Sequence, residues 1–112
     1  MSFAKSYRRM FDRFGRRVSI ERTVANADPL IALNVRARLT EARPIEVAGG
    51  VTSTERRVLI LAEDVPPTLC PLRKGDYVVV DGLRLRFTDR PDDQTRRDGE
   101  TLIAFEGWAA GG

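Results

Sequence analysis

The chain has 112 residues, of which 42% are hydrophobic and 31% charged, and its formal net charge is +3. This composition is typical of one globular domain, 1–112, and it excludes the disordered, collagen-like and membrane-spanning classes. The sequence has no histidine and a single cysteine, which excludes His-dependent catalysis, histidine-ligated metals and a disulfide within one chain. We therefore expect a protein that is not an enzyme, holds no metal or cofactor and has no membrane partner.

Residues 3–14 have the 3.6-residue period of an amphipathic helix, which Gly15 would end. We favour packing of its apolar stripe on the domain's own core over packing on a neighbouring subunit. The stripe consists of Phe3, Tyr7, Met10, Phe11 and Phe14. Residues 1–22 carry seven basic against two acidic side chains, which indicates either an anionic partner or a solvated helix face. The candidate partner contacts on this helix are Arg8, Arg9 and Arg13.

From residue 17 onward the hydrophobic period changes to two, which indicates half-buried β-strands. The pair Asp81-Gly82 predicts a two-residue hairpin, because both positions of such a turn favour positive φ. Together these patterns predict a mainly β fold: a small antiparallel β-barrel or sandwich of about six strands, 17–108, with an N-terminal α-helix and a flexible tail, 109–112. The predicted strands are 17–24, 33–40, 55–62, 77–80, 83–89 and 101–108.

Alternation also assigns the faces of two strands. In 33–40 we expect Leu33, Val35, Ala37 and Leu39 to point inward, and in 83–89 we expect the same of Leu83, Leu85 and Phe87. The arginines between them would then point outward. If these strands were neighbours, their outer face would form a basic patch able to bind phosphate backbones, although pairing with carboxylates of another subunit is equally consistent. The patch would comprise Arg36, Arg38, Arg84 and Arg86.

Between the second and third predicted strands, residues 41–54 show no clear period. Pro44, Gly49 and Gly50 favour a long projecting loop. Its apolar residues Ile45, Val47 and Val51 argue against a loop that is only a solvated connection. In the proline-rich connection 63–74, we expect Cys70 to be a small packed hydrophobe.

Three stretches follow the predicted helix in this order: RRVSIERTV, then RARLTEARPIEVAGGVTSTERRVLI, then KGDYVVVDGLRLRF. The last of them contains the pattern GD-x-V-x-VDG-x-x-x-x-F. Over roughly residues 15–108 this order resembles the small head–tail connector proteins of tailed bacteriophages, in the head-completion, stopper or head–tail joining group. Tail-terminator and minor tail proteins use similar hairpins.

The resemblance implies a small β-barrel that is a structural virion protein. Such proteins form homo-oligomeric rings of six or twelve copies below the portal and its adaptor ring. The ring closes the DNA-filled head and docks the tail terminator or tail tube protein, while duplex DNA passes through its channel. The implied location is the virion neck, after assembly in the host cytoplasm, in a phage, prophage or phage-derived particle.

On this chain, the loop 41–54 would reach the channel or a partner, and no catalytic residue carries over. The implied contacts in the loop are Arg43, Glu46, Val47 and Val51. Two alternatives remain: a tail terminator or minor tail protein, and, from another class, a small β-barrel that binds nucleic acid.

Overall fold

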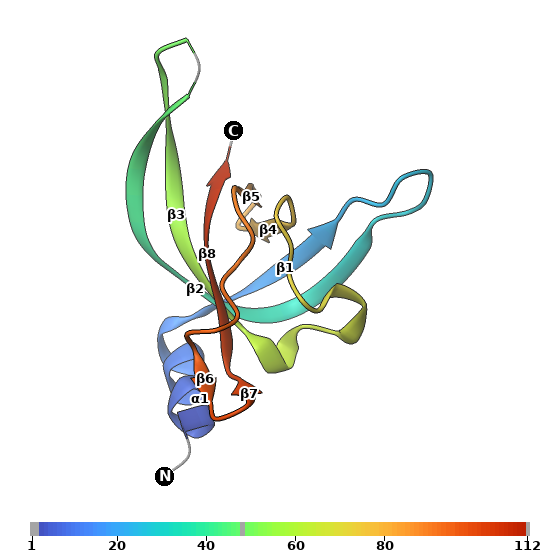
Figure 1. Cartoon of the computed structure of the whole chain (residues 1–112), viewed down its shortest axis with the longest axis vertical. Helices are drawn as coiled ribbons and strands as arrows, with labels where there is room; N and C mark the ends of the chain where they lie inside the picture. Colours follow the sequence, from blue (N-terminus) through green and yellow to red (C-terminus); the bar gives the residue numbers. More distant parts are fainter. Residues whose placement is uncertain (1–2, 48, 112) are drawn as a thin grey trace.

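A closed six-stranded antiparallel barrel forms the body of the molecule (Figure 1). The computed structural model describes residues 3–47 and 49–111, without the side chains of 3–4, 45–47 and 51–53. Around the barrel the strands run β1-β2-β3-β8-β5-β4, and β4 pairs with β1 to close the circle. Their bounds are β1 (Arg16–Arg22), β2 (Leu30–Val47), β3 (Val51–Leu61), β4 (Tyr77–Val80), β5 (Leu83–Phe87) and β8 (Ala104–Gly111). The predicted mainly β fold is confirmed.

Shorter elements connect these strands. The helix α1 (Phe3–Phe14) precedes β1, and two 3₁₀ turns, η1 (Ala62–Asp64) and η2 (Pro67–Leu69), follow β3. A small hairpin of β6 (Arg97–Asp98) and β7 (Thr101–Leu102) precedes β8. The predicted turn between β4 and β5 is confirmed, since both Asp81 (φ 50°) and Gly82 (φ 76°) have positive φ.

Alternating side chains fill the barrel. Inward positions of all six strands meet in one apolar cluster, which includes Ile20, Val35, Val58, Ile60, Val78, Leu85, Phe87 and Phe105. In β3 the neighbouring residues Leu59 and Leu61 are buried as well, although they point outward. They are buried because α1 covers this part of the barrel, so β3 reads as a continuous apolar run.

The helix packs on the barrel through part of its apolar stripe. Phe11 is fully buried against Leu59, Leu61 and Ala104, and Tyr7 and Met10 pack beside them. Phe14, at the end of the same stripe, stays 59% exposed. Gly15 does not end the helix through positive φ; a side chain there would collide with backbone oxygens of Phe11 and Ala37. The side chain of Phe3 lies outside the described part of the chain.

A β-bulge in β2 overturns one face assignment. Val18 and Ile20 of β1 pair with Val35 and Ala32 of β2, so β2 has one extra residue between these pairs. Asn34 lies in this bulge and has a φ of 57°. The bulge reverses the alternation before it, and Leu33 is therefore 70% exposed, not in the core. Leu83, near the edge of the turn, is also exposed, in contrast to its predicted inward position.

The segment 41–54 projects from the barrel, but it is not the irregular loop that we expected. It is the end of a long β2–β3 hairpin, paired from Ala42–Arg56 to Val47–Val51. Pro44 is compatible with this strand because β2 has no second neighbour there, so no N–H is required on its outer side. Figure 1 shows the projection at the end of the molecule opposite α1.

Two further expectations are wrong. Residues 109–111 are not a flexible tail: Ala109 is fully buried and pairs with Phe87 and Arg56 in β8. Gly112 lies outside the described residues. Cys70 is exposed and not packed, because Leu69 and Leu72 on either side supply the buried side chains of this connection.

Candidate interaction surfaces

The projecting end of the β2–β3 hairpin is the first candidate surface, and we call residues 44–47 and 51–54 the arm. β1 pairs with β2 only as far as Ala37, and β8 pairs with β3 only from Glu55. Each strand of the arm therefore has the other as its sole partner among the described strands. At about 3.4 Å per residue, four residues carry the arm about 14 Å beyond the barrel. Of the predicted contacts, Glu46, Val47 and Val51 lie here, and their side chains are outside the described part.

A polar clamp holds the base of the arm. Arg43 donates to Oε2 of Glu55 from Nη2 (3.0 Å) and Nε (3.3 Å). Its guanidinium also stacks on the ring of Trp108, 3.8 Å from the centroid. Glu55 is only 6% exposed, so the pairing compensates for burial of its charge. Arg43, one of the predicted contacts with the channel or a partner, thus joins the base of the arm to β8, and about half of its side chain stays exposed (52%).

The basic helix is the second candidate surface, and its three predicted arginines have different surroundings. Arg8 is tied to Glu63, with Nε to carboxylate distances of 2.8 and 3.0 Å. Arg9 is exposed and has no carboxylate partner among the described residues. Arg13 contacts the ring of Phe14 at 5.3 Å and also has no carboxylate partner in this described region. Of these three arginines, Arg9 and Arg13 therefore keep a charge that no described carboxylate compensates.

The predicted basic patch on two strands does not form. β2 and β5 lie on opposite sides of the barrel, because two strands separate them in either direction around the circle. Arg36 and Arg38 of β2 therefore cannot share a face with Arg84 and Arg86 of β5. The sequence could not reveal this, since the alternation of a strand does not say which strand lies beside it.

The charge of Arg36 is also compensated internally. Its guanidinium and backbone N–H donate to Asp64 (2.8–3.0 Å), and the guanidinium also reaches Asp12 (3.1 Å) and Glu63 (2.9 Å). The hydrogen bonds with Asp64 are the main cause of a raised pKa at Arg36. Burial alone would raise the pKa of Asp64, but the bonds from Arg36 outweigh it and lower that pKa. Arg36 therefore joins α1, β2 and η1.

On the opposite side, the two arginines of β5 differ. Arg84 stacks on Tyr77 at 3.8 Å and lies 3.5 Å from a carboxylate oxygen of Glu21. Arg86 is exposed, with no ion pair in the described residues. On the outer side of β5, Arg86 is thus the one arginine without an ion pair among the described residues, and a single arginine is too few to bind a phosphate backbone.

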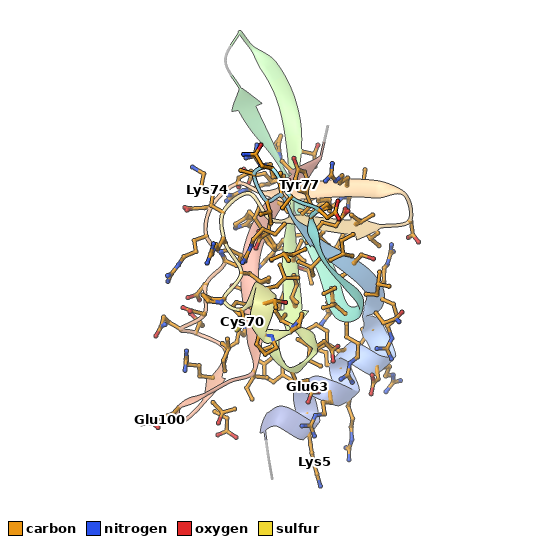
Figure 2. The ribbon with its side chains drawn as sticks, turned by 90° about the vertical axis from the view of Figure 1, so that its right-hand side faces the viewer. Lys5, Glu63, Cys70, Lys74, Tyr77 and Glu100 are labelled. Carbon is orange, nitrogen blue, oxygen red and sulfur yellow. The ribbon has the colours of Figure 1, made fainter. Side chains whose placement is uncertain are left out.

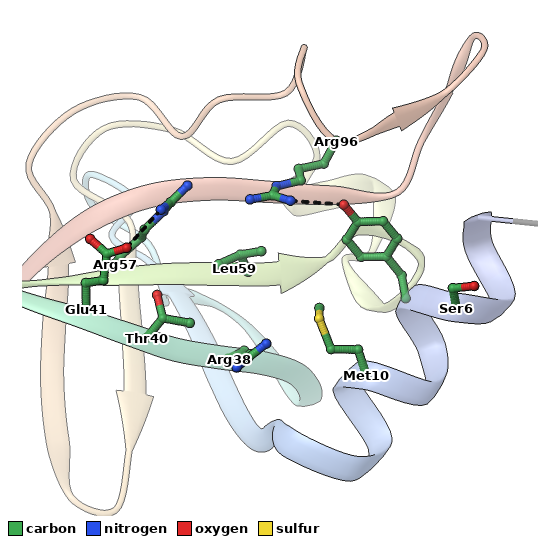
Figure 3. A pocket seen from close by; sticks show the side chains of 9 residues that line it. Ser6, Met10, Arg38, Thr40, Glu41, Arg57, Leu59 and Arg96 are labelled. Carbon is green, nitrogen blue, oxygen red and sulfur yellow. Dashed lines mark hydrogen bonds and ion pairs between the residues drawn. The ribbon is translucent and has the colours of Figure 1, made fainter.

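A pocket of about 300 Å³ between α1 and the outer side of β2 and β3 was not predicted (Figure 3). Two arginines of its lining, Arg57 and Arg96, pair with Glu106 at 2.6 and 2.7 Å. Burial opposes ionisation of Glu106, but these two arginines outweigh it and lower its pKa. Arg96 also donates to the hydroxyl of Tyr7 (3.1 Å), which raises the pKa of Arg96. No short-range sequence pattern connects these residues.

The described residues contain no group of three or more acidic or thiol side chains that could hold a metal ion. Among them, no helix has the length and hydrophobicity required to cross a bilayer. Comparison with protein-family models and with curated proteins gives no match to this sequence.

Proposed function

We propose that this chain is a structural subunit of the neck of a tailed phage, prophage or phage-derived particle. In this proposal, copies form a ring that closes the DNA-filled head and offers a docking surface to the tail. The stopper or head-completion position is preferred over that of a tail terminator. Support comes from the resemblance of residues 15–108 to connector proteins, together with the barrel carrying an arm.

The arm is the observation that carries the proposal. A two-stranded ribbon on its own is marginally stable in water, and its open edges are templates for pairing with another chain. The clamp of Arg43, Glu55 and Trp108 nevertheless fixes its base. An arm that is directed but unsupported along its length suits a protein that gains its remaining contacts on assembly.

The position of the helix adds a second argument. The arm and α1 lie at opposite ends of the long axis, and the views in Figures 1 and 2 agree on this. The molecule extends about 50 Å along that axis and 34 Å and 26 Å across it. A subunit with separate contact elements at its two ends can bind one neighbour above and another below, as a ring between a head and a tail requires.

The nucleic-acid-binding alternative is less well supported. It depended on four arginines forming one patch, and these lie on opposite sides of the barrel, with Arg36 internally paired. Duplex DNA remains a partner in the proposal only as the content of the channel.

The test removes the arm and keeps its base. Residues 44–54 are replaced by Asn-Gly, which closes a two-residue hairpin on the pair Arg43–Glu55. The matched control replaces the exposed residues 25–28, in the turn between β1 and β2, by Asn-Gly. Both proteins should keep a cooperative thermal unfolding transition, because no side chain that the structure describes as buried is removed by either replacement.

The variants are then introduced into the replicon that encodes the chain. We expect the armless variant to give particles that lose packaged DNA or lack tails, measured by DNase-protected DNA and electron microscopy, and the control to give normal particles. Infectious, DNA-retaining particles from the armless variant would contradict the proposal. So would absence of the wild-type protein from the neck in a cryo-electron reconstruction.

A further inference from the structure

The pocket between α1 and the barrel has an apolar floor and a basic rim. The floor is formed by Tyr7, Met10 and Leu59, and Figure 3 shows Met10 and Leu59 converging between the helix and the sheet. Arg38, Arg57 and Arg96 surround it, and Ser6, Thr40 and Glu41 complete the lining. This combination fits a ligand with an apolar body and an anionic group.

The three rim arginines differ in how far their charges are compensated. Arg57 pairs with Glu41 (3.2 Å) and Glu106 (2.6 Å), and Arg96 shares Glu106. Arg38 has no carboxylate partner among the described residues; its guanidinium carbon lies 5.5 Å from the centroid of the Phe14 ring. An aromatic face attracts a cation without neutralising it. Arg38 therefore presents a net positive charge at the pocket.

The ring of Phe14 also contacts a second arginine without a carboxylate partner among the described residues, Arg13. Arg13 lies 5.3 Å from the centroid of Phe14, so Arg13 and Arg38 both contact one exposed ring. Arg13 follows Met10 by three residues, so it lies beside this lining residue on the helix surface. The result is a pair of arginines beside an exposed phenylalanine, and both residue types are enriched at protein interfaces.

We infer that this pocket binds an acidic peptide segment of a partner protein, and that the segment carries apolar side chains beside its carboxylates. A carboxylate pairs with Arg38 and Arg13, and an apolar side chain covers Tyr7, Met10 and Leu59. A nucleic-acid backbone fits less well, because a phosphate chain offers no alkyl group to the apolar floor. The inference goes beyond the proposed function and does not require the chain to form a ring.

The experiment uses fluorescence anisotropy with the full chain and a short labelled peptide of alternating Glu and Leu. Three comparison probes are a Glu-Ser peptide, a Lys-Leu peptide and a short DNA duplex. The double variant Arg13→Glu/Arg38→Glu reverses both free charges and breaks no ion pair among the described residues. The matched control is Arg86→Glu, an exposed arginine on the opposite side of the barrel.

We expect the Glu-Leu peptide to bind more tightly than all three comparison probes. The double variant should weaken it about 100-fold, since each lost charge-assisted contact corresponds to about tenfold. The Arg86→Glu control should change it less than about twofold. In the wild-type protein, the Glu-Leu peptide should shift the amide resonances of Met10, Arg38 and Leu59. This measurement locates the binding site whether or not the double variant folds.

Five outcomes would overturn the inference. Equal binding of the Glu-Leu peptide by the wild type and the double variant would place the site elsewhere. If the Lys-Leu peptide bound as tightly as the Glu-Leu peptide, the site would not require negative charge. If the Glu-Ser peptide did so, the site would not require apolar side chains. Tighter binding of the duplex would identify a nucleic-acid surface. Self-association that the double variant abolishes, without peptide binding, would make a second copy the occupant.

Discussion

The ion pair between Arg22 and Asp76 gives the sharpest test of how the barrel is held together. Asp76 is 2% exposed and accepts from Arg22 Nε (2.9 Å) and Nη2 (2.8 Å) and from the backbone N–H of Arg73 (2.8 Å). Arg22 also donates to the carbonyls of Leu69 (3.2 Å) and Pro71 (3.0 Å). The pair thus joins β1 to the proline-rich connection and to the start of β4.

Asp76→Ala leaves the guanidinium of Arg22 buried without a counter-charge. Removing one partner of a buried pair costs about 3–5 kcal/mol in the free energy of unfolding. For a domain of this size, that corresponds to a lowering of Tm by about 12–20 °C. The arginine does not relieve this cost by losing its proton, because a guanidinium stays protonated in proteins even without a counter-charge.

The assay is urea unfolding followed by circular dichroism, combined with thermal scans. The matched control is Arg16→Ala, which removes the ion pair of the same strand with Asp81 (2.9 Å), where both side chains are exposed. This control should cost at most about 1 kcal/mol. Arg22→Ala/Asp76→Ala should lose less than the sum of its single variants. A loss below about 1 kcal/mol for Asp76→Ala would refute the reasoning.

Three further predictions follow from burial and charge. Phe87→Ala should cost about 3–5 kcal/mol in urea unfolding because the ring is fully buried, and a loss below about 1 kcal/mol would contradict its core position. Gly15→Ala should lower Tm, because its Cβ would lie 2.4 Å from a backbone oxygen of Phe11 and 2.8 Å from one of Ala37; an unchanged Tm would show that the helix can shift freely. The lowered pKa of Glu106 contributes stability that is present above its ordinary value of 4.5 and lost as pH falls through the lowered value, so Tm should fall with acidification below that pH. Glu106→Gln should flatten this dependence, and an identical profile would exclude the contribution.

Local patterns in the sequence were sufficient for much of the fold. The helix 3–14, the β4–β5 hairpin with Asp81-Gly82 and the inward side of β5 at Leu85 and Phe87 all follow from short-range periodicity and turn chemistry. These features depend on neighbours two to four residues apart. The sequence contains that information directly.

Errors in the sequence reading arise where distant strands determine the outcome. Leu33 became exposed because β1 imposes a bulge on β2, and 109–111 became a strand because β3 and β5 both pair with it. Residues 41–54 lacked a clear period because the arm has no core on either side to demand one. The same cause makes the arm a candidate contact element.

For the candidate surfaces too, some features could be predicted from the sequence and others depend on the tertiary structure. The sequence by itself determined that the N-terminal segment is basic and that the chain has no histidine, and its period-two patterns predicted a small antiparallel β-domain. Only the tertiary structure decided which arginines keep a free charge: Arg36 is compensated by Asp64, whereas Arg38 meets Phe14 at the mouth of a pocket. The physical reason is that electrostatic compensation depends on distances of a few ångströms in space, between residues that the order of strands around the barrel brings together.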